Sequence, residues 1–135
     1  MENRTALLVG ATGLIGRHCL ECLLSEDSYE RVGALTRRTT GMDHPKLSEL
    51  VTDFERLAEV LEQIRGDDVY LCLGTTLGKA GSRRRFREID YGYSLTIATA
   101  AQLNGARQLL LVSSVGASPR SSAFYLQVKG ELEAA

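Results

Sequence analysis

A run of glycines near the N-terminus limits the folds open to this chain more than any other feature. Gly10, Gly13 and Gly16 follow an apolar run at 6–9 and precede a stretch of helical period at 17–24. Glycines let the backbone approach a pyrophosphate closely, and the next helix presents free N–H groups and its positive dipole end to the anion. The spacing therefore predicts a dinucleotide-binding turn. The alternative interpretation is that the glycines only shape a tight turn between a strand and a helix.

Short apolar runs alternate along the chain with longer stretches of helical period, the pattern typical of βαβ units and a parallel sheet. We expect strands at about 5–10, 31–36, 48–52, 68–73 and 107–113, and helices at about 14–25, 54–64, 82–103 and 121–135. Right-handed crossovers then predict a Rossmann-type, doubly wound α/β sheet of about five strands in the order 3-2-1-4-5. At 135 residues the chain is expected to form a single domain, 1–135.

Two of the expected helices carry apolar stripes that predict which face packs on the sheet. The stripe of the first helix consists of Leu14, Ile15, Cys19, Cys22 and Leu23. The stripe of the helix before the fifth strand consists of Phe86, Ile89, Tyr93, Ile97 and Ala100.

Charge and cysteine content restrict the partners and the location that we expect. Sixteen basic and seventeen acidic residues leave a formal charge of −1, which favours neither nucleic acid nor an acidic membrane surface. The arginine-rich run at 83–87 is interpreted as a solvated helix start. No apolar run is long enough to span a membrane, and the N-terminus does not read as a signal peptide, so a cytoplasmic location is expected. The odd number of cysteines, three, predicts reduced thiols, and we expect no bound metal.

The end of the second expected strand bears on the choice of cofactor. An acidic residue at this position binds the 2′-hydroxyl of NAD, but this chain has Arg37 and Arg38 there. Two guanidinium groups can clamp a 2′-phosphate, so the pair predicts NADP(H) rather than NAD. The alternative is a pair of solvated loop arginines.

Further cofactor contacts are expected after the third and fourth strands. Asp53 can accept a hydrogen bond from the adenine amino group, or it can cap the helix that follows, and these two roles do not exclude each other. Leu73 and Gly74 end the fourth strand, where the ligand crevice of such a sheet lies. Together with the arginine pair, the expected cofactor-binding residues are Gly10, Thr12, Gly13, Leu14, Ile15, Gly16, Arg37, Arg38, Asp53, Leu73, Gly74, Tyr125 and Lys129.

The candidate catalytic residues follow the fifth expected strand. Tyr125 and Lys129 are four residues apart, so they share one face of a helix. A neighbouring ammonium favours the phenolate, which makes Tyr125 a candidate general acid/base for a carbonyl oxygen while a hydride moves at carbon. A serine at the end of the fifth strand, Ser113 or Ser114, is a candidate to hold that oxygen.

These motifs resemble the atypical and extended branch of the short-chain dehydrogenase/reductase superfamily over the whole chain. The segments at 72–76, 78–81 and 125–131 are similar, more narrowly, to the Tat-interacting-protein-like oxidoreductases. The resemblance implies a Rossmann fold, NADPH binding and a catalytic group formed by Ser114, Tyr125 and Lys129, with Lys129 also holding the nicotinamide ribose. It also implies pairing with a second copy through the face around Tyr91 and Tyr93.

The resemblance leaves the activity of this chain open, because proteins of the superfamily continue past the helix that carries tyrosine and lysine. The chain is therefore expected to be truncated at its C-terminus, with much of the substrate pocket missing. The function we expect is an NADP(H)-dependent oxidoreductase acting on a small carbonyl or alcohol substrate. One alternative is a non-catalytic NADPH-binding sensor or protein-interaction module. Another is a protein like the sugar-nucleotide epimerases and dehydratases.

Overall fold

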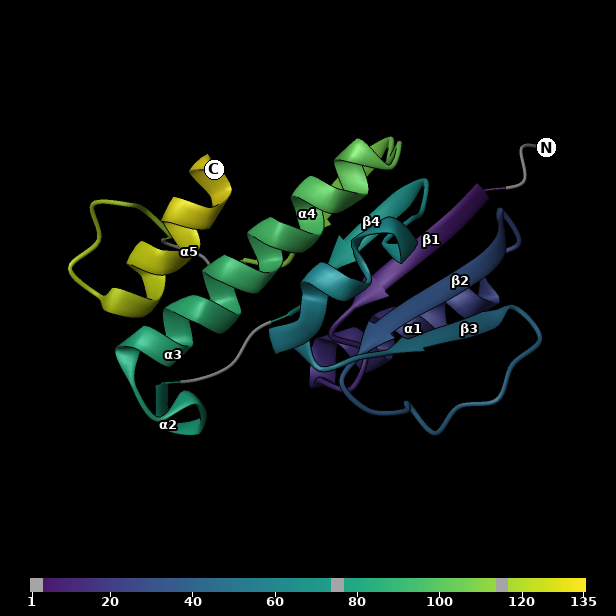
Figure 1. Ribbon diagram of the computed structural model, residues 1–135, viewed down its shortest axis with the longest axis horizontal. Coiled ribbons are helices and arrows are strands. Elements are labelled where there is room, and N and C mark those ends of the chain that lie inside the picture. Colours follow the sequence, from purple (N-terminus) through teal and green to yellow (C-terminus); the bar gives the residue numbers. More distant parts are fainter. Residues whose placement is uncertain (1–3, 74–76, 114–116) are drawn as a thin grey trace.

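The computed structural model describes residues 4–73, 77–113 and 117–135, and these form one parallel five-stranded sheet flanked by helices (Figure 1). The strand order is β3-β2-β1-β4-β5, which confirms the predicted order and the doubly wound α/β class. The order reverses direction between β1 and β4. The carboxyl ends of these two strands diverge into connections on opposite faces, so the sheet has its crevice there.

The strands are short and lie close to their expected places. They are β1 (Arg4–Val9), β2 (Tyr29–Thr36), β3 (Leu47–Val51), β4 (Asp68–Leu71) and β5 (Gln108–Leu111). The helical segments are α1 (Leu14–Ser25), η1 (Phe54–Glu59), η2 (Leu61–Gln63), α2 (Leu77–Ala80), α3 (Arg83–Arg87), η3 (Glu88–Tyr93), α4 (Ser94–Leu103) and α5 (Phe124–Ala134).

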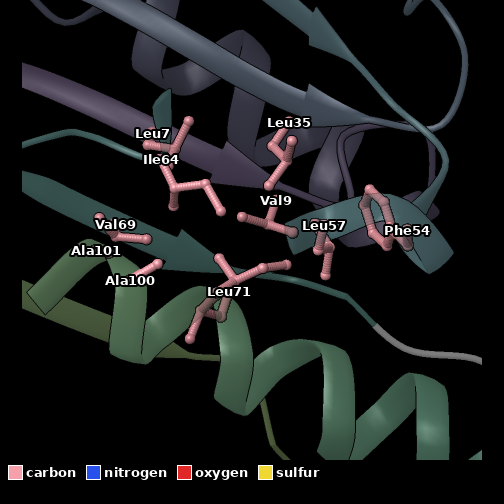
Figure 2. Packing of buried hydrophobic residues seen from close by; sticks show 11 residues of the cluster. Leu7, Val9, Leu35, Phe54, Leu57, Ile64, Val69, Leu71, Ala100 and Ala101 are labelled. Atoms are coloured by element: carbon pink, nitrogen blue, oxygen red, sulfur yellow. The ribbon is translucent and has the colours of Figure 1, made fainter. Parts of the chain in front are cut away.

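The hydrophobic core has two parts, one on each face of the sheet, because successive side chains of a strand point to opposite faces. Leu7 and Val9 of β1 pack with α4, η1 and η2 on one face, as Figure 2 shows for the residues of this cluster. Ala6 and Leu8 point to the other face, where Leu20 and other residues of α1 cover them. Burial on both faces explains why β1 reads as a continuous apolar run.

The segment 54–64 is expected from its sequence to form a regular helix, and this prediction is wrong. Two 3₁₀ segments, η1 and η2, occupy this stretch, and Arg56 inside η1 has non-helical backbone angles. Asp53 caps η1, since its Oδ1 accepts a hydrogen bond from the backbone N–H of Glu55 at 3.0 Å. The segment is held by tertiary packing, because Phe54 and Leu57 are buried in the core cluster of Figure 2.

The expected stripe of α1 is right at Leu23 and Cys19, which belong to or pack on the core, and wrong at its other three positions. The helix buries Gly16, Leu20, Leu23 and Leu24, whereas Leu14 is 79% exposed and Ile15 is 57% exposed. Gly16 packs closely on the turn before the helix, so the helix face that carries Gly16 and Leu20 lies toward the sheet, and the apolar side chains of the first turn lie on the exposed side. Leu14 and Ile15 are thereby left at the mouth of the cavity described below.

A π-helical segment, η3, changes the buried face of the long helical region from 83 to 103. Phe86, Ile97 and Ala100 of the expected stripe are buried. Ile89 and Tyr93 are only half-buried, and Asp90 and Ser94 are fully buried between the apolar members of the stripe. A π segment adds residues to a turn and so displaces the stripe predicted from a period of 3.6. The polar side chain of Asp90 is therefore placed inside the molecule.

The arginine-rich run begins a helix and is largely exposed, as expected, but two of its arginines also contact α5. Arg83 lies over the ring of Phe124, 5.1 Å from its centroid. Arg87 forms an ion pair with Glu131. These contacts join α3 to α5, the helix that carries the candidate catalytic pair, and place the two helices side by side (Figure 1).

Candidate functional site

A cavity of about 890 Å³ opens at the carboxyl ends of the strands, where the strand order reverses. It receives residues from the glycine turn, from the ends of β2, β4 and β5, and from the helical segments α1, η1, α2, α3, η3 and α5. The lining comprises Gly10, Thr12, Gly13, Leu14, Ile15, Gly16, Thr36, Arg37, Arg38, Phe54, Cys72, Leu73, Lys79, Ala80, Arg85, Ile89, Tyr93, Val112, Ser113, Tyr125 and Lys129. A space of this size is large enough for a dinucleotide.

The glycine turn has the geometry that close backbone packing requires. Gly10 has φ of +86°, a left-handed conformation that favours glycine, and a Cβ at this position would lie 2.7 Å from the carbonyl oxygen of Cys72. A Cβ at Gly16 would lie 1.9 Å from the carbonyl oxygen of Gly10. Gly13 is the N-cap residue of α1 and has no side chain to cap it. The first N–H groups of α1 therefore face the cavity without a protein side-chain cap, as an anion site needs.

The arginine pair lies beside this turn at the end of β2. Arg37 and Arg38 both line the cavity and are exposed, and no hydrogen bond or ion pair engages either guanidinium within the described residues. The turn that carries them is fixed by Thr36, a buried residue whose hydroxyl donates to the carbonyl oxygen of Arg38 at 2.6 Å. Two positive charges are thus presented on the side of the cavity where a Rossmann domain places the adenine ribose.

Tyr125 and Lys129 line the same cavity from α5, so the structure brings the catalytic candidates and the glycine turn together. The Nζ of Lys129 is 5.6 Å from the centroid of the Tyr125 ring. Tyr125 is 37% exposed, and its ring packs against Phe86 with the centroids 5.3 Å apart. The tyrosine thus has one supported face while the remainder of the side chain is accessible from the cavity.

Lys129 has a partner that the sequence did not reveal. Its Nζ donates a hydrogen bond to Oδ1 of Asp90 at 2.9 Å, and both side chains are almost completely buried. Burial raises the pKa of Asp90, and the hydrogen bond and charge of Lys129 oppose that rise. The available signal was an aspartate at helical spacing between the apolar residues Phe86 and Ile97, because a buried carboxylate needs a partner.

Serine and glycine candidates at the strand ends are only partly described. The hydroxyl of Ser113 is buried at the cavity wall and has no hydrogen-bond partner within the described residues. Ser114 and Gly74 lie outside the described residues, so the choice between the two serines stays open. Leu73 lines the cavity as expected.

Several lining residues were missed because they come from segments with no cofactor motif. Phe54 and Tyr93 pack edge to face with centroids 5.8 Å apart, and both line the cavity. Arg85 lies beside them, donating to the hydroxyl of Tyr93 at 2.9 Å and pairing with Glu88 at 3.0 Å. Asp53 is absent from the lining, so its cap on η1 is the role that the structure displays.

The cysteines carry no sign of catalysis. Cys72 lines the cavity, and burial raises the pKa of its thiol to about 12, so it stays protonated and weakly nucleophilic near neutral pH. Cys19 is half-buried, and burial raises its pKa as well. Cys22 is exposed, which corrects its expected place on the buried stripe.

The parallel sheet, the uncapped glycine turn and the cavity at the reversal of strand order together define a Rossmann domain of the dinucleotide-binding type. The chain belongs to the NAD dependent epimerase/dehydratase family, whose sequence pattern matches residues 6–130. It is an atypical member of the short-chain dehydrogenase/reductase superfamily, as its motifs predicted.

Two curated relatives illustrate the similarity. Protein FMP52, mitochondrial, from Candida albicans is 39% identical over 134 residues, which cover 96% of this chain and 58% of the relative. Protein HTATIP2 from Rattus norvegicus is 37% identical over 138 residues, which cover 99% of this chain and 57% of the relative. The chain thus spans less than two thirds of the length of these relatives.

Solved structures share the fold at low sequence identity. A short chain dehydrogenase family protein from Francisella tularensis matches with a TM-score of 0.74 and 18% identity, over 97% of this chain and 60% of that protein. MoeE5 in complex with UDP-glucose and NAD matches with a TM-score of 0.80 and 18% identity, over 96% of this chain and 47% of that protein. Among the described residues of our chain, no helix is long and apolar enough to cross a membrane.

Proposed function

We propose that this chain is the cofactor-binding part of an NADP(H)-dependent oxidoreductase that acts on a small carbonyl or alcohol substrate. The observation that carries the proposal is that Tyr125 and Lys129 line one cavity with the glycine turn and with Arg37 and Arg38. The complex of MoeE5 with NAD supports a nicotinamide cofactor in this fold. The substrate itself and the cytoplasmic location remain predictions, and the FMP52 relatives are named as mitochondrial.

The residues fit a dinucleotide in an orientation that follows from their charges. The pyrophosphate would lie at the N-terminus of α1, between Gly10 and Gly16, because free N–H groups and the positive dipole end meet there. A 2′-phosphate would lie between Arg37 and Arg38. The nicotinamide half would then extend to the opposite side of the turn, toward β5 and α5.

In the proposed mechanism, Tyr125 donates its phenolic proton to the carbonyl oxygen of the substrate, and it accepts that proton in the reverse direction. A nicotinamide cofactor held in this cavity would supply or accept the hydride at the carbonyl carbon. The ammonium of Lys129 lies 5.6 Å from the centroid of the Tyr125 ring, and it would hold the nicotinamide ribose, the role that the family resemblance implies. A serine at the end of β5 holds the carbonyl oxygen, and Ser113 is the described candidate, with a buried hydroxyl still lacking a partner within the described residues.

Two measurements test this proposal. Calorimetric titration of the chain with NADPH and with NADH should show tighter binding of NADPH, and absence of NADPH binding contradicts the proposal at its first step. The protein extended to the length of its relatives should consume NADPH with a member of a carbonyl panel such as 4-nitrobenzaldehyde. Loss of that turnover in Tyr125→Phe with NADPH binding retained supports the enzyme. NADPH binding without turnover of any panel member favours the sensor.

A further inference from the structure

The buried ion pair of Asp90 and Lys129 has a consequence for the charge of the cofactor cavity. The side chain of Lys129 is 5% exposed and reaches the cavity wall, while the side chain of Asp90 is 0% exposed and lies behind it. Oδ1 of Asp90 accepts from the ammonium, and Oδ2 has no hydrogen-bond partner within the described residues. The carboxylate therefore places a negative charge in a poorly solvated position beside the wall.

The cavity lining is strongly cationic, so the negative charge of Asp90 has a large effect on its electrostatics. Five cationic side chains line it, and no aspartate or glutamate does so among the described residues; the cations are Arg37, Arg38, Lys79, Arg85 and Lys129. The arginine pair lies at the expected adenine side, and Arg85 is already paired with Glu88 and Glu55. On α5, Lys129 faces the ring of Tyr125 and the carboxylate of Asp90. Asp90 is thus the acidic residue in direct contact with Lys129, at the end of the cavity opposite the arginine pair.

We propose that the negative charge of Asp90 determines how tightly this end of the cavity binds the oxidised cofactor, NADP⁺, relative to the reduced cofactor, NADPH. It holds the Lys129 ammonium in place and cancels its charge, so that a cationic nicotinamide ring can bind beside it. Asp90 is in this sense a positioning residue that acts through Lys129. The inference rests on the proposed function, because it requires a nicotinamide dinucleotide bound with its nicotinamide near α5.

The sign of the effect follows from the charges of the two cofactors. The nicotinamide ring of NADP⁺ carries a positive charge that NADPH lacks, while the phosphates of the two molecules are the same. Removal of the Asp90 charge leaves the Lys129 ammonium uncompensated, which disfavours the cationic ring of NADP⁺ relative to the neutral ring of NADPH. Removal of the ammonium leaves the carboxylate, which attracts NADP⁺. The ratio of the two dissociation constants, Kd for NADP⁺ over Kd for NADPH, therefore reports the charge of the pair.

The experiment measures this ratio by calorimetry for the wild-type chain, Asp90→Asn, Lys129→Met and the double variant. Asp90→Asn is compared with the wild type at pH 6, which keeps the ammonium charged. Lys129→Met is compared with it at pH 8, because burial raises the pKa of Asp90 and the lone carboxylate ionises fully only at higher pH. We expect the ratio to rise about fivefold or more in Asp90→Asn and to fall by a similar factor in Lys129→Met, the scale of one partly screened unit charge. The double variant should return to near the wild-type ratio.

The matched control is Glu131→Gln, which removes a second ion pair of α5, that of Glu131 with Arg87 of α3. A purely structural role changes the affinities for both cofactors together, so an unchanged ratio in Asp90→Asn and in Lys129→Met overturns the inference. If Asp90→Asn does not fold, Lys129→Met compared with the double variant at pH 8 isolates the Asp90 charge, and the ratio should be higher in the double variant. A wild-type chain that binds neither cofactor instead refutes the proposed function, and the inference with it.

Discussion

The ring of Phe86 packs 5.3 Å from the ring of Tyr125, measured between centroids, at the contact between α3 and α5. Four residues after Phe86, Asp90 binds Lys129, which is four residues after Tyr125. Phe86 therefore contacts one candidate catalytic residue of α5, Tyr125. Asp90, one turn further along, contacts the other, Lys129. The supporting side chains are 0% exposed, so their contacts are protected from water.

Truncation of Phe86 should destabilise the protein and loosen Tyr125. Phe86→Ala removes a fully buried ring, and a cost of about 3–5 kcal/mol in the free energy of unfolding is expected from comparable core truncations. Urea unfolding followed by circular dichroism measures it. Leu103→Ala is the control, since that side chain is 82% exposed and should change the stability by about 0.5 kcal/mol or less. A similar cost in both variants would contradict the contact.

Replacement of Arg37 and Arg38 by alanine should weaken NADPH binding much more than NADH binding. The guanidinium groups are exposed at the cavity, so their removal costs little stability while removing the charges that would face a 2′-phosphate. A loss of about tenfold or more in NADPH affinity is expected for two charge-assisted contacts, and calorimetry measures it. Arg107→Ala, which removes a mostly exposed arginine beside Asp67 rather than at the cavity, is the control. Equal losses for both cofactors show that the arginines do not read the phosphate.

The ion pair of Asp90 and Lys129 should show strong coupling in stability. Asp90→Asn or Lys129→Met alone removes one partner of a buried pair, which costs about 3–5 kcal/mol in comparable cases because a charge stays buried without compensation. The double variant should be more stable than the sum of the single losses predicts. Urea unfolding of the four proteins completes the cycle, and strictly additive losses would rule out a direct pair.

Two glycine variants should have different effects: Gly16→Ala should lower the stability of the protein, whereas Gly13→Ala should weaken cofactor binding. A Cβ at Gly16 would meet the Gly10 carbonyl oxygen at 1.9 Å, so the backbone must shift and unfolding should occur at a lower urea concentration. A Cβ at Gly13 would lie 3.7 Å from the same oxygen, an ordinary contact, so this variant should keep its stability. We expect Gly13→Ala to weaken NADPH binding, because a methyl group at the N-cap of α1 crowds the pyrophosphate. A stable Gly16→Ala protein would argue against the close approach.

Stability should fall at alkaline pH through Tyr29. Its hydroxyl donates to Oδ2 of Asp68 at 2.5 Å and lies 2.7 Å from the hydroxyl of Tyr70. Burial first, and then the hydrogen bond to Asp68, raises its pKa well above the ordinary value of 10.0. The folded state thus holds this proton more tightly than the unfolded state, so its contribution is complete below pH 10 and is lost as the pH rises above it.

Urea unfolding between pH 8 and pH 11 measures this loss. Tyr29→Phe should be less stable than the wild type at pH 8, since it loses the hydrogen bonds, but its stability should fall less steeply above pH 10. Parallel curves for the two proteins would show that Tyr29 is not responsible.

The amino-acid sequence by itself determined the parallel sheet, its strand order, the glycine turn, and the membership of Arg37, Tyr125 and Lys129 in one crevice. These features depend on local periodicity, turn chemistry and the rule that the carboxyl ends of parallel strands meet at one edge. Only the tertiary structure decided the 3₁₀ form of 54–63, the burial of Asp90 and its pairing with Lys129, 39 residues away. These features arise because packing overrides helical period and because a buried charge is stabilised by whichever partner the fold brings to it.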